Sequence, residues 1–309
     1  MRVKNVSVLK RFLSILLCVG LIFGLLPAIA RAEETEAASE EASTTESQYS
    51  EDDYTYVYLV KTKKNNLVYD LNGKKYKPYD KYTYKYDENG LIVKSDRDSN
   101  NPAGTQGQLG ETIYEYDENK NLIHVDGPYF DFTYYYKNNR LVKFDMFSLR
   151  VVAGYSAKHH KHKLKYRKKD RSVYIPYCAG GLPLPKGDRY SFSKGGKPQK
   201  SWFSKDPQNG SWSGKGSYSY DKKGNLAKFK SENISSKSIS TTKYSLTYKK
   251  GRLTKRKNSQ PDNQVTSTTY KYRKVKILKK YKKQVEEQQW RILNFDDLHD
   301  LGINQPWKY

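Results

Sequence analysis

Short stretches in which apolar and polar residues alternate recur along the middle of the chain, and the clearest of them ends in a turn. Tyr218 and Tyr220 alternate with serines, which is the period of a half-buried β-strand. Asp221 and Gly224 then occupy the first and fourth positions of a type I turn, where Asp accepts hydrogen bonds from turn amides and Gly adopts a positive φ. Leu226 resumes the apolar pattern. This stretch therefore predicts a β-hairpin.

The same pattern returns along the chain at a nearly regular interval. The clear copies contain the pairs Tyr84/Tyr86, Tyr114/Tyr116, Tyr134/Tyr136 and Leu246/Tyr248, and the fainter ones contain Tyr56/Tyr58, Leu164/Tyr166, Tyr190/Phe192 and Tyr270/Tyr272. The second members of successive pairs stand 20 to 30 residues apart. A repeated period of this kind indicates a repeat protein, here with one hairpin per unit.

We therefore expect an all-β fold of repeated antiparallel hairpins between residues 54 and 275. So many strands seldom remain in one flat sheet, so the sheet should curl into a partly closed barrel or two packed layers. Tyrosines on one strand face are expected to form the core, and lysines are expected on the other face.

The aromatic-x-aromatic-Asp-x-x-Gly-x-Leu pattern is complete from Tyr218 to Leu226 and partial in the other copies. It resembles the YD (Rhs-type) repeat family of bacterial extracellular proteins. The resemblance implies curved β-sheet walls and supplies no catalytic residues. Because this chain has few copies, irregular connections and no toxin-sized region after the last repeat, it looks like a small secreted YD-like protein rather than a toxin shell.

The periodicity changes after Tyr272, in the segment 276–309. Leu278, Tyr281, Val285 and Ile292 keep helical spacing, and the glutamates and glutamines between them favour a helix. We expect a C-terminal helix from about residue 279 to residue 293, placed where it covers the edge of the last strand.

The N-terminal 53 residues divide into two segments of opposite character. Residues 1–32 have a basic start, an apolar run and small residues before Ala32, and predict a signal peptide cleaved after Ala32. An uncleaved membrane anchor is the alternative. Residues 33–53 contain nine acidic and no basic residues, and predict a disordered linker. The alternative for residues 33–53 is that this acidic segment binds the basic remainder of the chain as an intramolecular clamp.

Charge then narrows the range of partners. The chain has 57 Lys and Arg against 33 Asp and Glu, and without the first two segments 52 − 24 leaves +28 for residues 54–309. Outside the cell this field attracts anionic cell-wall polymer or acidic glycan, whereas nucleic acid is not expected there. The alternative is that the lysines merely keep outward strand faces soluble. The candidate contacts are Lys161, Lys163, Lys165, Lys168, Lys249, Lys250, Lys255 and Lys257.

Two tryptophans are further candidates for ligand contact. Trp202 and Trp212 flank Pro and Asn-Gly turn signals and predict an additional hairpin. Their rings could stack on sugars from an open sheet face, but pairing across the hairpin in the core is the favoured interpretation.

The remaining reactive side chains predict neither catalysis nor a bound metal or cofactor. His159, His160 and His162 lie among lysines, which repel cations, so this segment is expected to be a basic loop. Cys178 is the only cysteine after residue 32 and has no evident base beside it in the sequence. No phosphate-binding loop, nucleophile elbow or strong metal-ligand spacing occurs.

The sequence hypothesis is thus a secreted, non-enzymatic protein of a Gram-positive-type bacterium, extracellular or loosely associated with the cell wall. The alternative function is an adhesion or protein-interaction module that uses an open aromatic sheet face to contact a surface protein.

Overall fold

The computed structural model describes residues 49–71, 74–100, 110–128, 130–148, 159–178, 185–205, 211–259 and 265–295. All of them belong to the compact unit Tyr49–Tyr309. The predicted signal peptide, its cleavage after Ala32, most of the acidic segment and the tail after residue 295 lie outside the described residues.

Seventeen strands form one antiparallel sheet, as the alternating pattern predicts. They are β1 (Tyr54–Asn66), β4 (Tyr79–Tyr86), β5 (Ile92–Ser99), β6 (Gly110–Tyr116), β7 (Leu122–Gly127), β8 (Phe130–Lys137), β9 (Arg140–Ser148), β10 (His159–Lys163), β11 (Lys165–Arg167), β12 (Ser172–Cys178), β13 (Pro185–Phe192), β14 (Pro198–Lys205), β15 (Trp212–Tyr220), β16 (Leu226–Asn233), β17 (Ile239–Lys249), β18 (Arg252–Ser259) and β19 (Val265–Leu278). A separate small hairpin contains β2 (Tyr69–Leu71) and β3 (Lys74–Tyr76).

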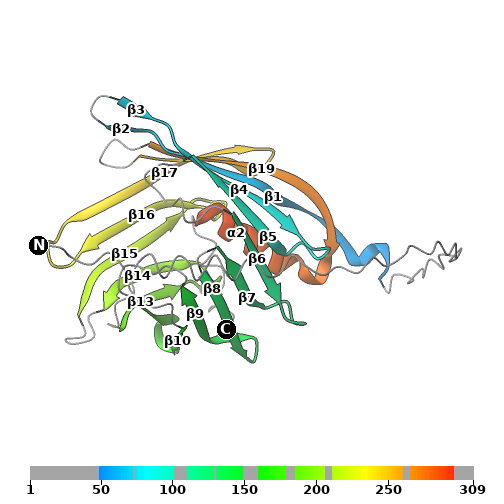
Figure 1. Cartoon of the computed structure of the whole chain (residues 1–309), viewed down its shortest axis with the longest axis horizontal. Coiled ribbons are helices and arrows are strands. Elements are labelled where there is room, and N and C mark those ends of the chain that lie inside the picture. The colour runs from blue at the N-terminus through cyan, green and yellow to red at the C-terminus, as the bar shows by residue number, and fades with distance from the viewer. Residues whose placement is uncertain are drawn as a thin grey trace, which may run out of the picture. The chain divides into compact units, whose positions relative to one another are not determined.

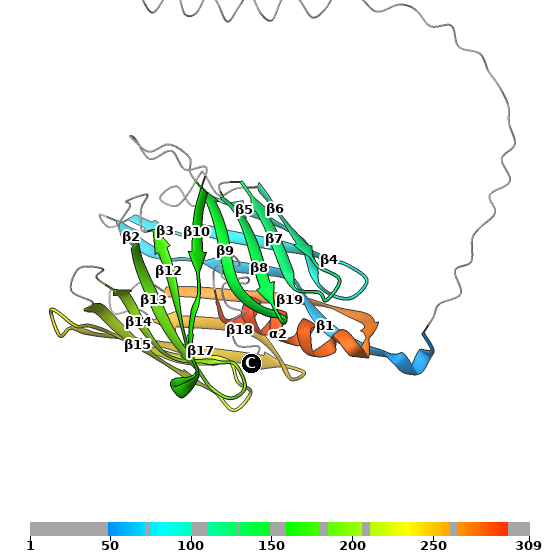
Figure 2. The ribbon, with the colours of Figure 1, turned by 90° about the horizontal axis from the view of Figure 1, so that it is seen from below.

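The strand pairings run almost completely around a ring. Successive strands pair from β4 to β10 and from β11 to β19. Only Leu164 separates β10 from β11, and β1 joins the two ends of the series because it pairs with both β19 and β4. The result is a nearly closed, barrel-like sheet that curves around a helix (Figures 1 and 2).

The repeated hairpins are built on the predicted turn. Asp221 Oδ1 accepts the backbone N–H groups of Lys223 and Asn225 at 2.9 Å each, and Gly224 has φ +79°. Equivalent Asp-centred turns follow β4 and β6, with Gly90 at φ +82° and Lys120 at φ +59° in the position of Gly224. Local side-chain chemistry therefore stabilises these turns.

The second aromatic residue of a repeat links it to the preceding repeat. Strand register shifts by one residue at this position in five of the hairpins, which is a recurring β-bulge. In six repeats the tyrosine hydroxyl donates to a backbone carbonyl 14 to 26 residues earlier, at 2.5–2.9 Å. The donors are Tyr86, Tyr116, Tyr136, Tyr166, Tyr220 and Tyr272. Burial raises the pKa of Tyr86, Tyr116 and Tyr272, so these hydroxyls stay neutral donors.

The inner face of the sheet carries the core, as expected. Tyr84, Tyr114, Tyr134 and Tyr270 are buried there with aliphatic residues of the return strands, whereas most strand lysines are exposed. Lys63 is an exception, because its side chain is fully buried and Nζ donates to the carbonyl oxygen of Phe295 at 2.6 Å. That bond replaces the hydration which a buried ammonium group loses.

The C-terminal helix forms where the sequence predicts it but occupies a different place. A short 3-10 turn, η5 (Lys279–Tyr281), leads into α2 (Lys282–Asn294). The last strand, β19, has no free edge to cover because β1 and β18 pair with its two sides. Instead, α2 lies against the concave face of the sheet (Figures 1 and 2) and buries Val285 and Ile292 in the core.

Amide side chains of α2 bond to strand backbone from inside the sheet. Gln288 Oε1 accepts the N–H of Ile92 at 3.0 Å, Gln288 Nε2 donates to Tyr116 Oη at 2.7 Å, and Tyr116 donates back to Ile92 O at 2.9 Å. Gln289 repeats this three-membered network one repeat earlier, with Val60 and Tyr86, through bonds of 2.7, 3.2 and 2.6 Å. The helix therefore satisfies strand amides of two neighbouring repeats.

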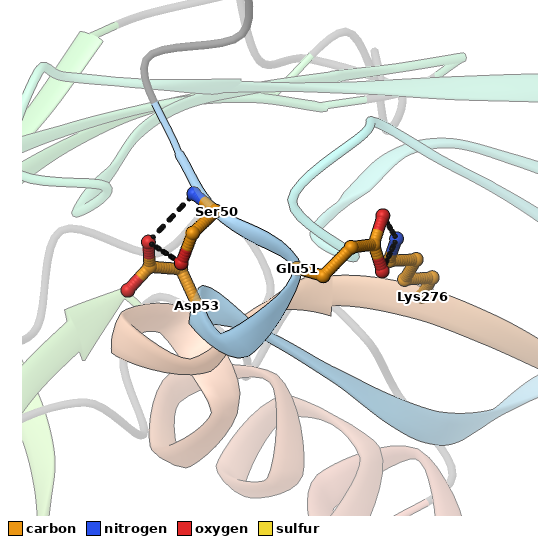
Figure 3. A network of polar contacts seen from close by, with 4 residues as sticks. All are labelled: Ser50, Glu51, Asp53 and Lys276. Atoms are coloured by element: carbon orange, nitrogen blue, oxygen red, sulfur yellow. Dashed lines mark hydrogen bonds and ion pairs between the residues drawn. The ribbon is translucent and has the colours of Figure 1, made fainter.

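The end of the acidic segment is ordered, contrary to the expectation that disorder continues to residue 53. Glu51–Asp53 form the 3-10 turn η1, where the carboxylate of Asp53 accepts bonds from the N–H and hydroxyl of Ser50 at 2.9 Å (Figure 3). Both carboxylate oxygens of Glu51 lie 2.6 Å from Lys276 Nζ. This ion pair is one contact of the kind that the clamp alternative requires.

Candidate functional site

The last four strands of the sheet together carry a large excess of positive charge. Residues 226–278 contain 14 Lys and Arg but only two acidic residues, a net charge of +12. Among the described residues of this segment, Glu232 is the one carboxylate, and it pairs with Lys215 of the neighbouring strand at 2.9 Å. The cations of these strands therefore have little local compensation.

The two sets of candidate lysines lie in different parts of the sheet. Lys161, Lys163, Lys165 and Lys168 are exposed on β10, β11 and the adjoining 3-10 turn η3 (Lys168–Asp170). Lys249, Lys250, Lys255 and Lys257 are exposed on β17, β18 and their connecting turn. Strands β12 to β16 separate the two sets, so they contribute to a common field without forming one site.

The predicted tryptophan hairpin forms, but its rings do not pair across it. In the β14–β15 register Trp202 faces Lys215, and Trp212 faces Lys205. The favoured interpretation of a cross-strand core pair is therefore wrong. The ring of Trp212 lies 6.3 Å from that of Tyr174, and the guanidinium of Arg189 lies 5.7 Å from it. Sugar stacking by these tryptophans stays a prediction.

The histidine segment is a strand rather than the expected basic loop. His162 is buried in β10 with its ring centroid 4.8 Å from that of Phe144, and His159 Nδ1 lies 3.5 Å from Asp145 Oδ1. No group of three or more His, Cys, Asp or Glu among the described residues could hold a metal ion. Cys178 is the last residue of β12, opposite Pro185, and its side chain lies outside the described part of the structure.

A pocket that the sequence did not reveal opens beside α2. Its volume is about 400 Å³. Its walls come from the start of β1, the turn before β16, the β17–β18 turn, β19 and one side of α2. The lining residues are Tyr56, Val57, Tyr58, Lys223, Asn225, Tyr248, Gly251, Arg252, Leu253, Tyr272, Lys282, Val285, Glu286, Gln289, Trp290 and Leu293.

Aromatic rings and cations alternate in this pocket. The Arg252 guanidinium lies 3.9 Å from the ring centroid of Tyr58, and Lys223 Nζ lies 4.1 Å from that of Tyr248. Such contacts hold a cation at a ring without neutralising it. Burial and the hydrogen bond to Asp221 raise the pKa of Tyr248 to about 12, so this phenol adds no negative charge near neutral pH.

The same alternation continues out of the pocket along β1, and we call this row the tyrosine–cation strip. It comprises Tyr54, Tyr56 and Tyr58 with Lys276, Lys274 and Arg252, whose charged groups lie 4.5, 4.0 and 3.9 Å from the respective ring centroids. Tyr56 is 59% exposed and Tyr58 44%. Large rings with this exposure stand out in a sheet whose other tyrosines mostly face the core.

The pocket offers binding groups rather than paired catalytic acids. Glu286 is the one carboxylate among its lining residues, and its Oε1 lies 3.9 Å from Lys282 Nζ. Glycoside hydrolysis generally needs two carboxyl groups facing each other across the scissile bond. Stacking surfaces and uncompensated cations instead suit an anionic ligand with a ring.

In the described residues, no helix has both the length and the apolar character needed to span a membrane.

Comparison with known proteins does not show a family. No protein-family model and no curated protein matches the chain. Among solved structures, a porin-like protein from Bacteroides vulgatus is similar with a TM-score of 0.43 and 10% identity, covering 69% of this chain and 98% of that chain. A porin-like protein from Bacteroides uniformis gives a TM-score of 0.39 and 11% identity with the same coverage. A Photorhabdus luminescens Tc holotoxin pore structure gives 0.29 and 14% identity, over 59% of this chain and 10% of that chain.

Proposed function

We propose that the protein is a secreted, non-enzymatic YD-like repeat protein of a Gram-positive-type cell envelope. It holds anionic cell-wall polymer or glycan on the basic outer surface of its sheet. The observation that carries the proposal is the net charge of +12 on residues 226–278. A field of this sign concentrates polyanions near the surface and weakens as salt screens it.

The distribution of the lysines supports a diffuse mode of binding. The two exposed sets lie on separate strands, and each extends over more than one strand or turn. A summed potential depends mainly on how many charges are present, whereas a shaped site depends on which ones. Binding that requires no single lysine also accommodates a polymer of irregular sequence.

The experiment replaces four lysines with glutamine in each of two variants and measures binding to purified anionic wall polymer. One variant changes Lys161, Lys163, Lys165 and Lys168, and the other changes Lys249, Lys250, Lys255 and Lys257. We expect comparable losses that both shrink at high salt. A large loss in one variant and none in the other would replace the diffuse surface with a local site.

The alternative function is a protein-interaction module, and the exposure of Tyr56 and Tyr58 favours it. Aromatic packing against a protein partner depends little on ionic strength, because it excludes water from apolar surface. Salt-independent capture of a surface protein, together with no binding of anionic polymer, would select this function over the first.

A further inference from the structure

Hydrogen bonds within the protein hold the aromatic side chains of the pocket beside α2 in place. The indole N–H of Trp290 donates to Gly224 O at 2.7 Å. The hydroxyl of Tyr248 donates to Asp221 and accepts from Asn225 Nδ2 at 2.9 Å. Both rings are therefore fixed before binding, so ordering them costs a ligand little affinity. A volume of about 400 Å³ is in the usual range of small-ligand sites.

Two cations of the pocket are not neutralised. Lys223 and Arg252 contact the rings of Tyr248 and Tyr58, but neither forms an ion pair with a carboxylate among the described residues. Lys282 is only loosely paired, with 3.9 Å between its Nζ and Glu286 Oε1. An anionic group that enters the pocket can therefore bind these cations without displacing a carboxylate from them.

The strip indicates how a longer ligand leaves the pocket. Tyr56 and Tyr58 line the pocket, and Tyr54 continues the row outward on the same side of β1. At the far end, Lys276 already binds a carboxylate, because both oxygens of Glu51 lie 2.6 Å from its Nζ (Figure 3). The chain's own glutamate thus shows that a carboxylate is accepted beside these rings.

We infer that the pocket is a subsite for one sugar unit that carries an anionic group, with the neighbouring units of the polymer lying along the tyrosine–cation strip. The apolar faces of the sugar ring pack against Tyr58, Tyr248 and Trp290, and its anionic group binds Arg252 or Lys223. This inference rests on the proposed function and deepens it: the diffuse surface collects the polymer, and the pocket recognises a unit of it.

The test is calorimetric titration of the secreted protein with a galacturonic acid trisaccharide. The methyl ester of the same trisaccharide keeps the ring faces and removes the charge, and inorganic phosphate supplies charge without a ring. We expect the acid to bind at least about tenfold more tightly than either comparison ligand. If the ester binds as tightly as the acid, the anionic group is not required. If phosphate binds as tightly as the acid, the sugar ring is not required. Either result overturns the inference.

Matched variants locate the binding. Arg252→Gln and Lys85→Gln each remove one positive charge from a strand, but Lys85 is exposed on β4, outside the pocket and outside both lysine sets. We expect R252Q to weaken trisaccharide binding by about tenfold or more and K85Q by less than about twofold. Tyr58→Leu removes an exposed ring without touching the core, and should weaken binding similarly to R252Q. Thermal unfolding of each variant checks that the fold is retained.

The outcomes separate this inference from the proposed function. Equal losses of trisaccharide binding in R252Q and K85Q, or unchanged binding in Y58L, would overturn the pocket while leaving the diffuse surface intact. If Arg252→Gln leaves wall binding unchanged while the lysine variants weaken it, the proposed function stands. The pocket's role in recognising the wall polymer would then be overturned. Trisaccharide binding in the pocket without any wall binding would instead refute the proposed function alone.

Discussion

Replacing Gln288 with methionine tests the idea that α2 holds the sheet together from within. The substitution keeps the length and helical preference of the side chain but removes both polar atoms. Ile92 N–H then loses its acceptor at 3.0 Å, and Tyr116 Oη loses its donor at 2.7 Å. Gln288 is buried, so water cannot easily replace either bond.

The expected cost follows from those two losses. A buried backbone donor left unsatisfied costs about 1–3 kcal/mol, and a net hydrogen bond between neutral groups contributes about 1 kcal/mol. The apolar gain from methionine offsets part of this. We therefore expect the free energy of unfolding to fall by about 2–3 kcal/mol.

Equilibrium unfolding in urea measures this change, and the slope m should stay constant because the same surface becomes exposed. Gln289→Met provides an internal replicate, since its network with Val60 and Tyr86 has the same form. Gln284→Met provides the control, because within the described residues the Gln284 side chain makes one hydrogen bond, to the carbonyl of Lys120, and is only half-buried. If Gln288→Met and Gln289→Met cost no more than Gln284→Met, the helix does not support the strands in this way.

Three further predictions address the turns, the tyrosines and processing. Gly224→Val should destabilise the fold by about 1–2 kcal/mol or more, because φ is +79° and a β-branched residue resists that conformation; an unchanged melting temperature would rule out this turn. Buried tyrosines such as Tyr116 have a pKa raised above the ordinary value of 10.0, so their contribution to stability is complete below pH 10 and is lost as pH rises further. The share of the tyrosinate absorbance that comes from the buried tyrosines should therefore appear together with unfolding, and reversible ionisation of every tyrosine in a folded chain would contradict this. The N-terminus of the secreted protein should be Glu33, and an N-terminus upstream of it would favour the anchor.

The hairpins were predictable because their determinants are local. In the turns after β4, β6 and β15 the Asp side chain accepts an amide four residues later, so these turns are specified by neighbouring residues. The ordered turn at Glu51–Asp53 could also have been found, since Ser50 and Asp53 have the spacing of a capping box. The position of α2 could not be predicted, because the ring closure that removes the free edge of β19 pairs residues about 200 apart in sequence.

The pocket was missed for the same reason. Tyr58, Lys223, Arg252 and Trp290 belong to four segments that only the folded sheet brings together. The missing Asp-x-x-Gly turn after Tyr58 was no guide, because the Tyr134/Tyr136 copy also lacks this turn and Tyr134 is nevertheless buried. Only the folded structure shows that Tyr56 and Tyr58 are exposed.

Binding of the secreted protein to isolated Gram-positive cell walls, before and after removal of their teichoic acids, shows whether the basic surface holds anionic wall polymer. We expect strong binding to intact walls at low salt, a steep fall as salt approaches about 1 M, where the screening length is only about 3 Å, and little binding to stripped walls. Absence of binding to intact walls at low salt, or equal binding to stripped walls, would refute wall-polymer binding by this surface.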